Sequence, residues 1–346
     1  MKQIFRLIYI AISLLFFSCN SIAQQTDNYS AKIDSLIKLK NPRPFNGVIL
    51  ITKNGKTEFS KAYGFVNFKK EVLLNMDSQF EIMSNTKQIT AVLLLKEVEK
   101  GNVNLESPIK KYLPSLNKTW ADSVTVHQLL NHTHGITDLQ KPLAFKPGSD
   151  FKYGNLSNNL LGEIIENVSH KSYRKLAESL FKSLKMKNTF CFSQNDRRNL
   201  VFGHMNKDNV FKVVDSSFIN NENLPADGVV TTAKDLTIWN LNLHKGKILK
   251  PETYKLMTTS SVLSQHDVFG KEKMGYGYGI RIVEDNGIKY LGHTGLGDGF
   301  ASLNIYIPKS DVTIIVLENQ MNENSDMYYY FESKIKDIIL KSNLVQ

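Results

Sequence analysis

Strand-like segments lie at the two ends of this chain, and helix-like segments fill the middle. Apolar stretches at 47–52 and 57–63 are joined by Asn54-Gly55, which is a strong signal for a two-residue β-hairpin. Further strand patterns lie near the C-terminus, at 277–284, 287–292, 301–307 and 311–317. We therefore expect an α/β (α+β) fold in which both ends contribute to one antiparallel sheet, flanked by helices, with an all-helical region inserted.

Apolar residues at helical spacing predict the remaining elements. Ile33, Leu36 and Ile37 form the stripe of a short helix before the first strand. Longer helices are expected at 84–100, 125–131, 155–168, 172–184, 232–244 and 327–341. The chain then divides into a sheet region, 24–83 and 270–346, and a mainly helical region, 84–269. A seam between two such regions is where a ligand cleft usually forms.

The first 23 residues have the pattern of a secretory signal peptide. Lys2 and Arg6 precede an apolar run at 7–17, and this run is shorter than the about 20 residues needed to span a bilayer. Small residues before Gln24 predict cleavage there, and hence a protein secreted into or held in the periplasm of a bacterial envelope. The alternative is a lipoprotein, attached to the membrane through a lipid on Cys19.

Composition is that of a globular protein rather than a disordered one. Of the 346 residues, 42% are hydrophobic and 22% are charged. The formal charge of +10 is spread along the chain, without basic blocks interleaved with aromatic residues, so we expect no nucleic-acid partner. After removal of residues 1–23, Cys191 is the only cysteine, which excludes an internal disulfide and predicts a buried, apolar thiol.

A Ser-x-x-Lys motif at Ser84–Lys87 is the strongest candidate for a nucleophile and its base. The same spacing also begins at Ser35, Ser107, Ser115, Ser149, Ser172, Ser179 and Ser333. Only the motif at Ser84 follows a strand-like segment, 79–83, and opens a strongly apolar helix, 89–98. Residues three apart at a helix start share one face. The helix N-terminus also disfavours a nearby cation, which favours the neutral, proton-accepting form of Lys87.

Two further motifs each occur once in the chain. Tyr153 and Asn155 stand in a Tyr-x-Asn motif, on a loop before a predicted helix. His293, Thr294 and Gly295 end a predicted strand, where a glycine lets the backbone approach a ligand closely. Taken alone, the first motif could be a packed tyrosine with a helix cap, and the second an ordinary hairpin connection.

The order of these three motifs resembles the serine β-lactamase-like superfamily. The branch in question holds class C β-lactamases, D-Ala-D-Ala carboxypeptidases, D-aminopeptidases and related esterases. The likeness covers about residues 30–340 and includes the phrases Leu129–Ile136, Phe145–Gly148, Asp227–Asp235 and Gly299–Ser302. Two positions depart from the usual pattern: His134 stands where Ser is common, and His293 stands where β-lactamases of this branch usually have Lys. The His-Thr-Gly form resembles a D-Ala-D-Ala carboxypeptidase subtype.

The resemblance implies acyl transfer through a covalent intermediate and no cofactor. Lys87 would take the proton of Ser84, which attacks an amide or ester carbonyl, and Tyr153 would relay a proton to the leaving group. Backbone N–H groups of Ser84 and Leu296 would form the oxyanion hole.

The resemblance also assigns residues to substrate binding: Asn155, His293, Thr294, Gly295 and Leu296. Asn155 would hold the substrate's amide, and Thr294 with His293 would hold a carboxylate. Because the unperturbed pKa of histidine is near 6.5, we expect binding of an anionic substrate to weaken as pH rises through the pKa of His293.

Several functions share this machinery. The prediction is a D-Ala-D-Ala carboxypeptidase-like enzyme or a D-amino-acid peptidase or amidase, acting as a monomer on a small-molecule or peptide substrate, with cell-wall peptides among the candidates. A carboxylester hydrolase and a class C-like β-lactamase remain open. The alternative of another class is a non-catalytic penicillin-binding or sensing domain.

His132 and His134 superficially resemble the start of a metallo-β-lactamase site. In that pattern an aspartate and a third histidine follow within three residues, whereas here Asp138 comes too late. We therefore expect no metal site.

Overall fold

The computed structural model describes residues 28–195, 197–264, 269 and 273–345. The predicted signal peptide, which contains Cys19, and the predicted first mature residue, Gln24, lie outside these residues. Within the described part of the chain, no helix is long and apolar enough to cross a membrane.

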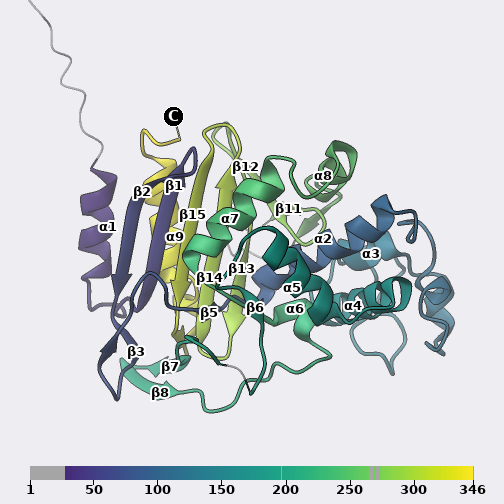
Figure 1. The fold of residues 1–346 in the computed structure, drawn as a ribbon, viewed down its shortest axis with the longest axis horizontal. Coiled ribbons are helices and arrows are strands. Elements are labelled where there is room, and N and C mark those ends of the chain that lie inside the picture. Colours follow the sequence, from purple (N-terminus) through teal and green to yellow (C-terminus); the bar gives the residue numbers. More distant parts are fainter. Residues whose placement is uncertain (1–27, 196, 265–268, 270–272, 346) are drawn as a thin grey trace, which may run out of the picture.

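One antiparallel sheet of eight strands runs through the molecule (Figure 1). In spatial order its strands are β10 (Val262–Ser264), β11 (Met274–Tyr276), β12 (Arg281–Asp285), β13 (Ile288–Gly297), β14 (Phe300–Ile307), β15 (Val312–Glu318), β1 (Gly47–Lys53) and β2 (Lys56–Tyr63). The two ends of the chain meet where Gly47 pairs with Glu318. Asn54 and Gly55 both have positive φ, as a two-residue hairpin requires. The predicted fold class is confirmed.

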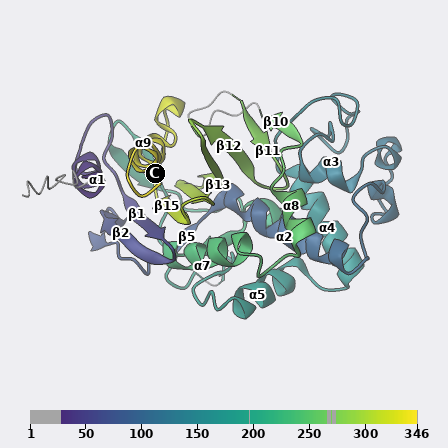
Figure 2. The same ribbon diagram turned by 90° about the horizontal axis from the view of Figure 1, so that it is seen from above.

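Both faces of this sheet are buried. Along β1, Val48 and Leu50 pack into one apolar cluster, whereas Ile49 and Ile51 pack into another. This alternation is the two-residue period of a strand with a core on each side. Helices α1 (Tyr29–Ile37) and α9 (Tyr330–Leu340) cover one face, and α7 (Ala233–His244) covers the other (Figure 2).

The region between the two parts of the sheet is mainly helical. Its other helices are α2 (Thr86–Glu99), α3 (Val126–Leu130), α4 (Leu156–Ser169), α5 (Tyr173–Ser183), α6 (Leu224–Asp227) and α8 (Pro251–Met257). The predicted helices are present with ends shifted by up to three residues, while α6 and α8 were not predicted. Short strands also pair in this region: β5 (Phe80–Glu81), β9 (Val229–Thr231) and β6 (Phe190–Cys191) form one small sheet, and β3 (Phe65–Asn67) pairs with β4 (Val72–Leu73). A third small sheet joins β7 (His204–Lys207) and β8 (Val210–Val213) to β16 (Met321–Asn322), which follows β15 in the chain.

One predicted strand, 277–284, is only partly a strand. Residues 277–280 form a turn, because Gly279 has a φ of +64° and packs against the backbone of Lys87, where a Cβ would lie 2.5 Å from the carbonyl oxygen. The sheet also reaches back to β10, so the expected boundary at 270 lies inside it.

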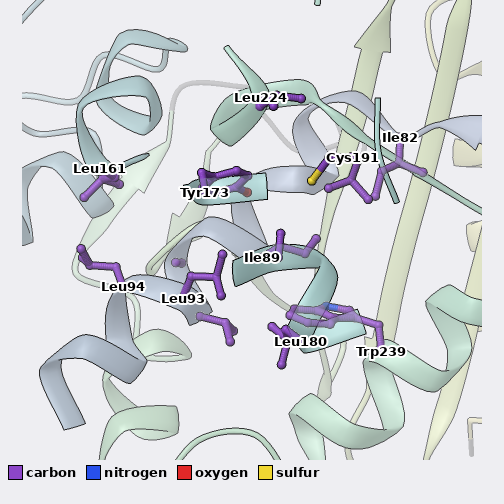
Figure 3. Close-up of a cluster of buried hydrophobic side chains, with 14 of the residues drawn as sticks. Ile82, Ile89, Leu93, Leu94, Leu161, Tyr173, Leu180, Cys191, Leu224 and Trp239 are labelled. Atoms are coloured by element: carbon purple, nitrogen blue, oxygen red, sulfur yellow. The ribbon is translucent and has the colours of Figure 1, made fainter. Parts of the chain in front are cut away.

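Helix α2 is buried on nearly every side, unlike a surface helix. Figure 3 shows this core, in which Ile89, Leu93 and Leu94 lie among residues from other elements: Leu161, Tyr173, Leu180, Cys191, Leu224 and Trp239. Each fully buried leucine or isoleucine stabilises the fold by about 1.5–3 kcal/mol. The start of α2, which directly follows the turn that contains Ser84, is therefore held by the core. Cys191 is buried as predicted.

Candidate active site

Ser84 lies in a single 3-10 turn, Met83–Asn85, that leads into α2. Its side chain is half-buried and so remains accessible, whereas Met83 is fully buried. Met83 has a φ of +48°, a region that L-residues rarely adopt. Such strained residues gather at functional sites, where the surrounding structure holds them in place.

Strand β13 lies directly against this turn. A Cβ on Gly295 would come 2.1 Å from the carbonyl oxygen of Ile82, so only glycine permits the approach. The contact is secured from β14 by Ser302, whose hydroxyl donates to Ile82 O at 2.9 Å and accepts from Asn85 Nδ2 at 2.8 Å. This close packing brings the end of β13, with Leu296, beside the turn that carries Ser84.

Lys87 points its ammonium group at Ser84. The side chain is completely buried, and its Nζ lies 2.8 Å from Ser84 Oγ, 2.8 Å from Asn155 Oδ1 and 3.2 Å from Ala226 O. In the other seven Ser-x-x-Lys motifs, all of them in the described residues, no hydrogen bond joins the lysine ammonium to the serine hydroxyl; at Ser172 the hydroxyl accepts only the backbone N–H of Lys175, as a helix cap. The helical context therefore identified the motif in which the two side chains meet.

Tyr153 and Asn155 come to the same place from the loop before α4. Lys87 Nζ lies 5.1 Å from the centre of the Tyr153 ring. The Asn155 side chain does not cap α4; instead it accepts from Lys87 and donates from Nδ2 to Asp227. His132 packs against Tyr153, with ring centres 4.7 Å apart.

Asp227, at the end of α6, is part of the site although no sequence motif indicated it. Its Oδ1 accepts the Ser84 hydroxyl at 3.0 Å and lies 3.6 Å from Lys87 Nζ. In sequence it is separated from Ser84 by 143 residues. Asp227 does begin the segment 227–235, which supported the family resemblance. That segment gave no reason to expect a contact between Asp227 and the nucleophile.

His293 does not have the environment that we expected. It is completely buried, its Nδ1 lies 2.6 Å from the carbonyl oxygen of Thr294, and its ring stacks on that of Tyr153. Burial, with the positive charges of Arg281 and Lys87, holds the pKa of His293 well below its ordinary value. The expected titration of His293 near pH 6.5 is therefore wrong, and the imidazole is neutral at physiological pH.

The cation in this part of the site is Arg281, which sequence reasoning missed. It stands on β12, one strand from His293, and is only 2% exposed. Its NH1 lies 3.0 Å from His293 Nε2 and 3.5 Å from Thr294 Oγ1. An arginine twelve residues before the motif carries no spacing signal, because the two residues meet only through strand pairing.

His132 and His134 are both buried. Their rings lie 6.1 Å apart, and among the described residues no group of three or more His, Cys, Asp or Glu is arranged to hold a metal ion. Burial lowers the pKa of His134 to about 4, and its Nδ1 accepts from the Ile136 N–H, so it is a neutral, structural residue.

Comparison with known proteins places the chain in a family. The beta-lactamase family model matches residues 43–333. Protein flp of Staphylococcus aureus (strain MRSA252) is 28% identical over 328 residues, which are 86% of this chain but only 64% of flp. A beta-lactamase of Providencia stuartii is 24% identical over 92% of this chain and 94% of its own length.

Among solved structures, the D-amino acid amidase of Ochrobactrum anthropi SV3 has the same fold, with a TM-score of 0.77 and 21% identity over 91% of this chain and 98% of the amidase. The family match covers most of the chain, and the resemblance inferred from the three motifs is confirmed. The chain belongs to the beta-lactamase family, whose members and structural neighbours are serine hydrolases.

Proposed function

We propose that this protein is an acyl-enzyme hydrolase that cleaves an amide bond in a substrate ending in a carboxylate. Its class would be that of a D-Ala-D-Ala carboxypeptidase or a D-amino-acid peptidase or amidase. The observation that carries this proposal is the buried guanidinium of Arg281 behind Thr294. No ion pair joins Arg281 to a carboxylate among the described residues.

Arg281 is a buried charge that has no carboxylate partner in the part of the chain that the structure describes. Removing a cation from water costs several kcal/mol unless an anion or well-placed hydrogen bonds offset that cost. Its nearest polar partners, His293 and Thr294, are neutral. A substrate carboxylate held by the Thr294 hydroxyl would bring a negative charge next to Arg281. A neutral ester would gain nothing from this charge.

The chemistry follows from the contacts of Ser84. Its hydroxyl attacks the carbonyl carbon while Lys87, 2.8 Å away, takes its proton. The oxygen that becomes negative is stabilised by the backbone N–H groups of Ser84 and Leu296. Tyr153, above Lys87, passes a proton to the leaving amine, and Asn155 orients both the lysine and the substrate's amide. Water then hydrolyses the acyl-enzyme.

A substrate panel on one preparation tests the proposal. We expect the highest kcat/KM with a D-Ala-D-Ala peptide or a D-amino-acid amide, and less with a chromogenic cephalosporin or short-chain neutral esters. Preference for the neutral esters would make the protein a carboxylester hydrolase, and preference for the cephalosporin would make it a β-lactamase. Acylation without release would identify a penicillin-binding or sensing domain.

Arg281→Met tests the recognition of the carboxylate. We expect KM for an anionic substrate to rise about tenfold or more, since a charge-assisted contact contributes about 1.5–3 kcal/mol, while KM for a neutral ester stays the same. Lys289→Met, which removes an exposed cation from the neighbouring strand, is the control. Equal changes for both substrates in Arg281→Met would show that the arginine only supports the fold.

A further inference from the structure

Asp227 contacts three polar side chains of the site, those of Ser84, Lys87 and Asn155. It accepts the Ser84 hydroxyl, lies 3.6 Å from Lys87 Nζ and accepts from Asn155. We propose that Asp227 becomes protonated when Lys87 loses a proton. The lysine is then neutral and can take the proton of Ser84. This inference rests on the proposed role of Ser84 as the nucleophile.

The hydrogen bonds of the resting site fit an ammonium and a carboxylate. Lys87 Nζ has three acceptors around it: Ser84 Oγ, Asn155 Oδ1 and Ala226 O. A charged lysine has three protons, and all three are used. The Ser84 hydroxyl keeps one proton to donate, and Asp227 Oδ1 receives it at 3.0 Å. In this state Lys87 has no lone pair for the proton of Ser84.

A coordinated proton shift gives a second state in which the same contacts are satisfied. Lys87 passes one proton to Ser84 Oγ while the Ser84 hydroxyl passes its own to Asp227 Oδ1. The amine then accepts from Ser84 and keeps two N–H groups for Asn155 and Ala226. The protonated Asp227 donates to Ser84 Oγ. No bond other than those to the two protons is made or broken, and neutral Lys87 can take the serine proton as Ser84 attacks.

Burial favours this pathway over the loss of a proton to water. Lys87 and Asp227 are both almost fully buried, and their summed charge is zero before and after the shift. An unpaired buried charge costs several kcal/mol, so a transfer within the pair avoids that cost. In the described structure, Asp227 is the acid that forms an ion pair with Lys87.

Other titratable or charged groups face the pair from three sides. Tyr153 lies above Lys87, and Arg281 of β12 lies 5.3 Å from the same ring. His293 of β13 has a lowered pKa, partly because of the charge on Lys87, and is neutral. Asp298, in the turn after β13, has a raised pKa because of burial and, to a smaller extent, the charge of Asp227.

The test is the rate at which a fluorophosphonate labels Ser84, measured against pH from 6 to 9. In the wild type we expect a nearly constant rate, because the proton count of the pair does not change. In Asp227→Asn, Lys87 must lose its proton to solvent, so the labelling rate of the variant should rise with pH. The ratio of the wild-type labelling rate to that of the variant should therefore fall as pH rises. At pH 6 we expect the wild type to be labelled about 10²–10⁴-fold faster than Asp227→Asn, which is the usual size of a general acid–base effect.

Asp235→Asn is the matched control, because it changes a buried carboxylate to an amide on α7, where it accepts from Asn188 and Thr189. We expect it to lower stability without changing the pH dependence of labelling. If the ratio of the labelling rates of wild type and Asp227→Asn is the same at every pH, the inference is overturned and Asp227 is only a positioning residue. If Asp227→Asn does not fold, a wild-type rate that rises about tenfold per pH unit overturns it equally. A wild type that is not labelled at Ser84 refutes the proposed function instead.

Discussion

Glu81 is expected to make the protein less stable as pH rises. It stands on β5, three residues before Ser84, and is 2% exposed. Its Oε2 is buried and has no hydrogen-bond partner in the described residues. The carboxyl group lines a cavity of about 250 Å³ together with Phe192, Gly203, Val214, Ser217, Asp298 and Phe300. Burial, and then the charge of Asp298, raise the pKa of Glu81 from 4.5 to about 8.

The sign follows from proton binding. Between pH 4.5 and pH 8 the unfolded chain has lost the proton of Glu81 while the folded chain retains it, so stability falls as pH rises through this window. One pKa unit corresponds to about 1.4 kcal/mol. The free energy of unfolding should therefore drop by about 3–4 kcal/mol between pH 5 and pH 8 because of Glu81 alone. Above pH 8 the loss levels off, because both states are then ionised.

Glu81→Gln removes this dependence, since the amide does not titrate. We would measure the free energy of unfolding from urea titrations at pH 5, 6, 7 and 8 for the wild type and the variant. The wild type should lose about 3–4 kcal/mol more than Glu81→Gln over this range. Glu58→Gln, on the exposed side of β2, is the control and should follow the wild type. Parallel curves for wild type and Glu81→Gln would refute the reasoning, because Glu81 would then ionise as it does in the unfolded chain.

Two further predictions concern the site and the mature chain. Gly295→Ala should reduce the rate of Ser84 labelling by about 10²-fold, since a Cβ 2.1 Å from Ile82 O forces β13 away from the turn; an unchanged rate in the folded variant would mean that this contact does not position the site. Intact mass should show a mature N-terminus at Gln24 in the soluble envelope fraction, whereas the mass of a lipid-bearing Cys19 would show the anchored alternative to be correct.

The parts of the fold that were predictable are those with a long, regular pattern. The hairpin at Asn54-Gly55 and the apolar helix after Ser84 each have a signal within a few neighbouring residues. The short strands β5, β9 and β6 have two or three residues each, which is too few for a periodicity to be seen. Their pairing depends on the distant segments that they meet.

The residues of the candidate site also fall into a group that the sequence predicted and a group that it did not. Ser84, Lys87 and Tyr153 were found because family-like motifs carry them. Asp227 and Arg281 were missed because each reaches the site only through tertiary contacts, one from the end of α6 and the other across paired strands. The expectation that His293 titrates in the ordinary range of a histidine failed for the same reason, since its pKa is lowered by burial and by neighbouring cations that no local sequence pattern shows.

The most direct measurement of the central proposal is the identity of the acylated residue. The protein would be treated with a fluorophosphonate or a penicillin, digested and analysed by mass spectrometry, with Ser84→Ala as the matched variant. We predict a single labelled peptide that contains Ser84, and no label on Ser84→Ala, which should remain folded because the half-buried hydroxyl contributes little packing. Label on any other serine, or equal labelling of Ser84→Ala, would contradict the assignment of Ser84 as the nucleophile.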